Sequence, residues 1–123
     1  MNYTITPSGD GKYITLTVTG EIHRKAAMQQ NLQAHALGRK LGINRYLVDV
    51  TGARNTDSVK DSYDFAYTDM SVTEGIDKTA RVATLVDPDD HSHDFIETVS
   101  RNSGLNVTFF TDLAQAVDHL LKE

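Results

Sequence analysis

Residues 45–52 read Arg45-Tyr46-Leu47-Val48-Asp49-Val50-Thr51-Gly52, a mostly apolar run that carries an aspartate near its end and breaks at a glycine. Such a run is typical of a buried parallel strand, because both faces of that strand pack against helices. Residues 53–58 follow as Ala-Arg-Asn-Thr-Asp-Ser, which predicts a loop and then a helix that begins at Asp57 and Ser58. The pattern predicts an α/β fold with polar side chains at the carboxyl end of a central strand, where such folds bind ligands.

Alternating and periodic patterns elsewhere complete a single mixed sheet. Residues 3–6 and 13–19 alternate apolar and polar side chains around a turn sequence, which predicts an antiparallel hairpin. The remaining expected elements are strands at 80–86 and 106–110 and helices at about 23–41, 57–72, 89–103 and 112–121. The order β-β-α-β-α-β-α-β-α with right-handed crossovers predicts a mixed, mostly parallel five-stranded sheet with an N-terminal antiparallel hairpin and four helices.

Two of the expected helices carry more apolar side chains than one core-facing stripe needs. In the helix at 57–72 the expected inward stripe is Val59, Tyr63, Ala66 and Met70, with Phe65 and Val72 off it. In the helix at 23–41 one arc is Ala27, Ala34, Leu37 and Leu41, and a second is Met28, Leu32 and Ala36. The surplus favours either a wide buried face or a contact with a partner, and a homodimer is one such contact.

Composition excludes several classes of function. The chain has 123 residues, a formal net charge of −5 and no cysteine. The length indicates a single domain over residues 1–123. Without a basic stripe, nucleic acid and anionic membrane surfaces are poor partners, and without cysteine there is no disulfide or thiolate metal site. No apolar run is long enough to span a bilayer or serve as a secretory signal, so we expect a cytoplasmic protein without membrane insertion.

The connections after the parallel strands, at residues 51–58, 87–94 and 111–112, are expected to meet at one edge of the sheet. The candidate binding residues at this edge are Asp49, Thr51, Asp57, Ser58, Asp87, His91, His93 and Thr111. Asp57 and Ser58 are expected to cap a helix, because their side chains accept bonds from the first-turn N–H groups. At that position Ser58 is also a candidate phospho-acceptor, since a phosphoryl group there would meet free N–H donors.

The segment Asp87–Asp94 is rich in carboxylates and contains two histidines. Oxygen and imidazole groups can hold a divalent cation, which leaves a metal-dependent enzyme as one alternative. Acidic residues and Pro88 also suit the first turn of a helix, and this interpretation is favoured. No specific metal spacing, nucleotide cradle or catalytic constellation is present, so no metal site, cofactor or enzymatic activity is predicted. His35 and His119 are expected at the surface.

The chain resembles the STAS family, the fold of anti-sigma-factor antagonists, and in particular its SpoIIAA-like relatives. One motif is the strand ending in Asp49-Val50-Thr51-Gly52 followed by Asp57-Ser58; the other is Ser103-Gly104-Leu105, then the apolar strand and an Ala-rich closing helix. In STAS antagonists the matching Asp-Ser pair begins a helix and the serine is phosphorylated by a partner kinase, which implies this role for Ser58. This chain departs from the regulated antagonists at Val59-Lys60-Asp61, where they have a small, Gly-containing stretch.

Three functions follow from these observations. The first is a non-enzymatic regulatory or protein-binding domain in bacterial signal transduction that uses the edge at residues 51–58. The second is a carrier of a small apolar ligand or lipid, because the SpoIIAA-like architecture also resembles that of CRAL-TRIO domains. The third is the metal-dependent enzyme built on Asp87–Asp94. An apolar cavity would favour the second function over the first.

Overall fold

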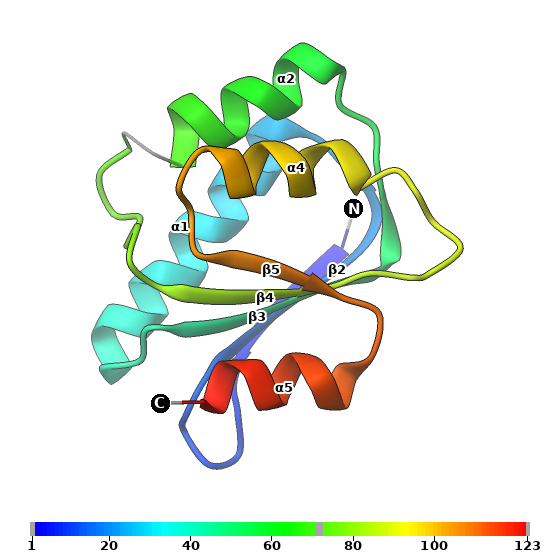
Figure 1. The fold of residues 1–123 in the computed structure, drawn as a ribbon. Coiled ribbons are helices and arrows are strands. Elements are labelled where there is room, and N and C mark those ends of the chain that lie inside the picture. The colour runs from blue at the N-terminus through cyan, green and yellow to red at the C-terminus, as the bar shows by residue number, and fades with distance from the viewer. Residues whose placement is uncertain (1, 71–72, 123) are drawn as a thin grey trace.

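The computed structural model describes residues 2–70 and 73–122 as one five-stranded sheet with helices on both faces (Figure 1). The elements are β1 (Asn2–Pro7), β2 (Ile14–Ile22), α1 (Arg24–Leu41), β3 (Arg45–Asn55), α2 (Val59–Asp64), the π-helix η1 (Phe65–Asp69), β4 (Arg81–Leu85), α4 (Asp94–Asn102), β5 (Val107–Phe110) and α5 (Leu113–Leu121). The strand order is β1-β2-β3-β4-β5. Only β1 and β2 pair antiparallel, and the other neighbours are parallel. The predicted mixed, mostly parallel sheet is confirmed.

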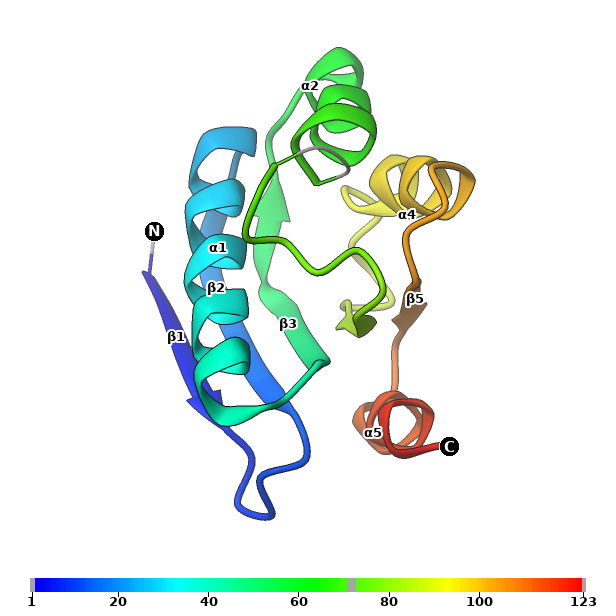
Figure 2. The same cartoon turned by 90° about the vertical axis from the view of Figure 1, so that its left-hand side faces the viewer.

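The two faces of the sheet carry separate apolar layers. Leu47 of β3 and Ala83 of β4 pack against Ala116 and Leu120 of α5. On the other face, Tyr46 packs with Ile14 of β2 and Ala34 of α1, and the next layer joins Leu16, Val18 and Val50. Figure 1 shows α5 on one side of the sheet and α1, α2 and α4 on the other. Figure 2 shows α1 over the β2 side and α2 and α4 toward β5, so the three helices surround the middle of the sheet.

A glycine ends the helix α1, and an aspartate from a distant segment caps its start. Gly42 follows it in the left-handed conformation with φ 71°, and its N–H donates to the carbonyl of Gly38. This agrees with the predicted stop at Gly42, because a residue with a side chain is strained at positive φ. At the other end, the side chain of His23 makes no capping bond. Instead Asp57 accepts a bond from the Arg24 N–H at 2.9 Å, so a residue distant in sequence caps α1.

The strand β3 continues to Asn55, so the prediction that it breaks at Gly52 is wrong. Gly52 pairs with Thr19 after a register shift between Thr17 and Thr19. A Cβ atom at Gly52 would lie 3.2 Å from Cγ2 of Thr19. The glycine therefore lets two strands approach closely across a bulge instead of ending one of them.

The segment after β3 also differs from the prediction. The α-helix ends at Asp64 and the chain continues as η1. The expected inward stripe is only half correct, because Ala66 and Met70 are buried whereas Val59 is 66% and Tyr63 50% exposed. Phe65, expected off the stripe, lines the interior. A π turn adds a residue to the helical repeat and so rotates the residues on either side of it relative to one another. Val72 lies outside the described residues.

Histidine placement is the clearest local error. His35 is 3% exposed, not at the surface. Its ring stacks on Tyr46 with centroids 4.4 Å apart, and its Nδ1 accepts a bond from the Asp77 N–H at 2.9 Å. His119 is half-buried against Phe110, with ring centroids 5.3 Å apart. Flanking polar residues indicated exposure, but an aromatic neighbour on another element covers each ring.

The surfaces behind the homodimer prediction are smaller than expected. Met28 and Leu32 are half-buried and Phe65 faces the interior, whereas Leu41, expected in the core, is exposed. Self-association therefore stays a prediction. Among the helices of residues 2–70 and 73–122, none has the length and apolar character needed to cross a membrane.

Candidate functional site

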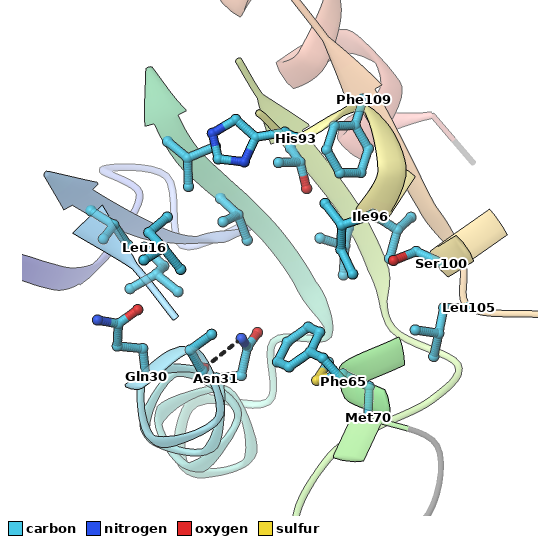
Figure 3. A pocket seen from close by; sticks show the side chains of 18 residues that line it. Leu16, Gln30, Asn31, Phe65, Met70, His93, Ile96, Ser100, Leu105 and Phe109 are labelled. Carbon is cyan, nitrogen blue, oxygen red and sulfur yellow. Dashed lines mark hydrogen bonds between the residues drawn. The ribbon is translucent and has the colours of Figure 1, made fainter. Parts of the chain in front are cut away.

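The most distinctive feature of the described structure is an apolar cavity of about 130 Å³ between the sheet and the helices α1, η1 and α4 (Figure 3). Its walls come from four strands and three helical segments. The lining residues are Leu16, Val18, Ile22, Ala27, Gln30, Asn31, Val48, Val50, Phe65, Met70, Val82, Thr84, His93, Ile96, Ser100, Leu105, Val107 and Phe109. Most of these side chains are aliphatic or aromatic, as expected of a ligand pocket.

The cavity follows from the way the sequence folds around it. Alternation along β3 and β4 turns Val48, Val50 and Val82 toward α1 and α4. Phe65 and Met70 close the side under η1, and Figure 3 shows Phe65 directed toward the centre. Because Val59 and Tyr63 point to solvent, α2 contributes little side-chain volume beneath it.

A few polar groups interrupt the apolar lining. Asn31 donates from Nδ2 to the Ala27 carbonyl at 2.8 Å. His93 is buried, and its Nε2 donates to the Ala53 carbonyl at 3.1 Å. Thr84 and Ser100 are 8% and 5% exposed. Among the described residues, neither of their hydroxyl groups has a protein hydrogen-bond partner, although both stay within reach of water.

A second, smaller pocket of about 70 Å³ lies next to the cavity at the carboxyl ends of the strands. It shares Ile22, Phe65 and His93 with the cavity, and it adds Asn55 and Asp57 at the edge of the sheet. The apolar interior therefore approaches the edge where the sequence predicted binding.

The expected edge does form. The Thr56 N–H donates to the Ile22 carbonyl at 2.9 Å, which joins the ends of β2 and β3. The Asn55 N–H donates to the Ser92 hydroxyl at 3.0 Å, which joins residues 51–58 to residues 87–94. Asp57 and the segment Asp87–Asp94 therefore lie at the same edge, as predicted.

At this edge Asp57 and Ser58 have capping roles. Ser58 is the N-cap of α2, and its hydroxyl accepts a bond from the Asp61 N–H at 3.1 Å. Asp57 caps α1 instead. The Ser58 side chain is exposed, so it is open to a modifying enzyme. Its role as a phospho-acceptor stays a prediction.

Arg24 joins α1 to the helices over the cavity. Its Nε and Nη2 donate to both carboxylate oxygens of Asp69, at 2.6 and 2.9 Å. Asp64 and Asp61 lie 3.5 and 3.9 Å from its Nη1. The hydrogen bond to Asp69 raises the pKa of Arg24 further, so the guanidinium stays charged. The hydrogen bond from Lys60 lowers the pKa of Asp64.

The segment Asp87–Asp94 is mostly a turn-rich loop, because α4 begins only at Asp94. His91 is exposed and pairs with Asp94 at 3.1 Å, whereas His93 is buried with Asp90 3.6 Å from its Nε2. The Ser92 N–H donates to Asp90 and lowers the pKa of that carboxyl. Within residues 2–70 and 73–122, no group of three or more histidine and carboxylate side chains is placed to hold a metal ion.

The remaining candidates do not join the site. The Asp49 carboxylate accepts bonds from the backbone N–H and the hydroxyl of Thr51, at 3.0 and 2.8 Å. Strand alternation places Asp49 on the opposite face from Val48 and Val50, which line the cavity. Thr111 is exposed beside Asp112, which caps α5. Asp87 does not line the cavity, and its carboxylate accepts a bond from the Asp89 N–H at 2.9 Å.

Sequence reasoning included His93 among the binding candidates but did not predict that Asn31, Thr84 and Ser100 line a cavity. Thr84 had one usable signal, since it is the only hydroxyl in the buried strand Arg81-Val82-Ala83-Thr84-Leu85. Ser100 and Asn31 had none, because a polar residue inside an amphipathic helix normally faces solvent.

Comparison with known proteins supports the fold and no more. No family model matches the sequence, and no curated protein matches it. The structure is similar to the crystal structure of an uncharacterised protein of the DUF3478 family with a SpoIIAA-like fold, from Shewanella loihica PV-4. The match has a TM-score of 0.53 and 20% sequence identity, and it covers 97% of this chain and 92% of the other. The fold of the chain is therefore SpoIIAA-like, as the sequence predicted.

Proposed function

We propose that this chain of SpoIIAA-like fold is a non-enzymatic binding domain that takes up a small apolar molecule. The observation that carries the proposal is the cavity between the sheet and the helices α1, η1 and α4. Protein interiors are close-packed, so an apolar void on this scale lacks contacts that a ligand would restore.

The volume of the cavity limits the size of the ligand. A void of about 130 Å³ is close to an engineered cavity of about 150 Å³ that binds benzene. It is well below the roughly 300–1,000 Å³ of pockets for drug-sized molecules. The proposed ligand is therefore a single ring or a short branched chain.

The chemistry of the lining supports binding without catalysis. The Nε2 atom of His93 bonds the Ala53 carbonyl and faces Asp90, and no described serine or threonine hydroxyl pairs with this ring. The exposed Ser58 caps α2. A nucleophile with an adjacent base, the usual mark of covalent catalysis, is not found among the described residues.

Titration of the ¹⁵N-labelled protein with toluene tests the proposal. We expect chemical-shift changes at amides around the cavity, such as those of Val50 and Val107. Val48→Phe should abolish them, because the added ring occupies the void. Val59→Phe is the matched control, since it makes the same change at an exposed site and should leave binding intact. Absence of any shift in the wild-type protein would overturn the proposal.

A second candidate function is protein binding by the outer face of α2 and η1, in bacterial signal transduction. The exposed rings of Tyr63 and Tyr67 stack with centroids 4.5 Å apart, beside exposed Val59 and the N-cap Ser58. The segment also carries the carboxylates Asp61, Asp64 and Asp69, which pair with Arg24. The proposed partner is a cytoplasmic protein with basic side chains around an apolar one.

Pull-down experiments test this second candidate. One defined protein should be captured by the wild type and by Val48→Phe, and lost from Tyr63→Ala/Tyr67→Ala. Comparison with Ser58→Asp shows whether negative charge at the N-cap changes capture. A partner that the double tyrosine variant retains would place binding elsewhere on the molecule.

A further inference from the structure

We propose that the cavity selects an uncharged ring compound that carries a hydroxyl or similar hydrogen-bond donor, and this inference rests on the proposed function. Five polar side chains line the apolar space, and three of them offer a group for a ligand to bond: Asn31 on α1, Thr84 on β4 and Ser100 on α4. A purely apolar ligand would form no hydrogen bond with the Thr84 hydroxyl, the Ser100 hydroxyl or the Asn31 Oδ1.

The two hydroxyl groups are the strongest evidence. Thr84 and Ser100 are both more than nine-tenths buried. In the described part of the chain, neither hydroxyl has a hydrogen-bond partner, whereas Thr98 and Ser103 nearby contact backbone carbonyls at 3.4 and 2.8 Å. Figure 3 shows the Ser100 oxygen on the cavity side of α4. Both hydroxyl groups line the cavity and stay within reach of water, so each can bond a water molecule or a polar group of a ligand.

The third group shows which kind of partner is missing. The Nδ2 of Asn31 donates to the Ala27 carbonyl, which leaves its Oδ1 as an acceptor. Figure 3 shows this oxygen turned from the helix toward the cavity. An amide oxygen only accepts, whereas hydroxyl groups both donate and accept. A ligand that forms hydrogen bonds with all three groups must therefore include a hydrogen-bond donor.

The ligand is also uncharged. Asn31, Thr84 and Ser100 carry no charge, and the lining is otherwise apolar apart from Gln30 and His93, whose Nε2 bonds the Ala53 carbonyl. An ion in this space would lose its hydration without gaining an opposite charge. The volume admits about seven non-hydrogen atoms, by comparison with the cavity that holds benzene. A phenol or a cyclic alcohol fits these limits.

Phenol and toluene are a matched pair of probes, because they differ only by a hydroxyl in place of a methyl group. Wild-type protein titrated with each by NMR should bind phenol at least tenfold more tightly, the effect of about one good hydrogen bond. In Ser100→Ala/Thr84→Val/Asn31→Leu the ring still fits but its hydroxyl loses all three partners. The order of affinity should therefore reverse in favour of toluene.

Ser103→Ala is the control, since its hydroxyl bonds the Ser100 carbonyl and is not part of the lining. This variant should keep the phenol preference. Thermal unfolding of each variant shows that the fold is retained. Toluene binding without a phenol preference would overturn this inference and leave the proposed function standing. Failure of both probes to bind the wild type would overturn both.

Discussion

Single side chains at the strand ends connect elements that are distant in sequence. Asp57 caps α1 from the far side of β3, and Ser92 supports Asn55 from the next connection. His93 donates to the Ala53 carbonyl beneath them. Each contact satisfies a backbone group that the end of a strand or helix would leave unpaired. The edge of the sheet is therefore held by polar side chains, and the cavity begins directly below it.

Ser58 is expected to contribute to stability through its cap whether or not it is ever phosphorylated. Ser58→Ala removes the acceptor for the Asp61 N–H and should lower the free energy of unfolding by about 1 kcal/mol. Ser58→Asp keeps an acceptor at the same position, so its stability should stay close to that of the wild type. Urea unfolding measures both, and equal losses in the two variants would contradict the capping role.

His35 should make stability depend on pH. Burial lowers the pKa of its ring, while Asp77 opposes the shift. The unfolded chain therefore binds a proton that the folded state resists, so the free energy of unfolding should fall as the pH drops below about 6.5. The loss continues until the pH reaches the lower pKa of the folded state.

His35→Asn tests this dependence, since asparagine offers an acceptor but does not titrate in this range. The variant should be less stable at pH 8, because the stack on Tyr46 is lost, but its stability should vary less between pH 5 and pH 7. Burial also lowers the pKa of His119, so His119→Asn should remove a separate part of the slope. An unchanged slope in His35→Asn would refute the assignment.

Among the elements, α2 and η1 are held in place partly by ion pairs with α1. Arg24 contacts three carboxylates on this segment, and its bond to Asp69 uses two nitrogens. Without the guanidinium, Asp61, Asp64 and Asp69 would repel one another at close range. The segment is also where the π turn interrupts regular helix geometry. Local opening should therefore begin here.

Arg24→Met keeps most of the aliphatic stem and removes the charge. Amide hydrogen exchange should become faster across residues 59–69 and stay unchanged in β3 and β4. Lys60→Met is the control, because it removes only the exposed pair with Asp64, and its effect should be smaller. Exchange that is unaffected by Arg24→Met would show that packing of Phe65 alone holds the segment.

Elements with strong local signals could be predicted, and those shaped by distant contacts could not. Gly42 and Gly104 both follow helices with positive φ, and Asp112 caps α5 where the last helix was predicted to begin. The continuation of β3 through Gly52 depends on Thr19 of the neighbouring strand. The late start of α4 depends on the turns of residues 87–93. Neither has a signature in its own residues.

For the whole molecule, the fold was predictable because the order of strands and helices restricts the topology to very few arrangements. The edge with Asp57 and Asp87 followed from the same rule. The cavity did not, because its volume depends on how α1, η1 and α4 pack over one sheet face. Periodicity shows which side of a helix is apolar. The exposed Val59 and Tyr63 show that it does not determine how the helix is rotated about its axis relative to the sheet.

An unfilled cavity should cost the whole domain stability. Val82→Ile and Val107→Ile each direct one methyl group into the space and should raise the free energy of unfolding by about 0.5–1 kcal/mol. The urea midpoint should rise with an unchanged m-value. The same variants should bind toluene less tightly, whereas the exposed control Val59→Ile should change neither property.

If filling the cavity left stability unchanged or lowered it, the helices would already be packed to the limit and the void would be too small to admit a ring. A joint gain in stability and loss of binding is expected only if the domain retains the space for a ligand, because a site kept for binding trades stability for function.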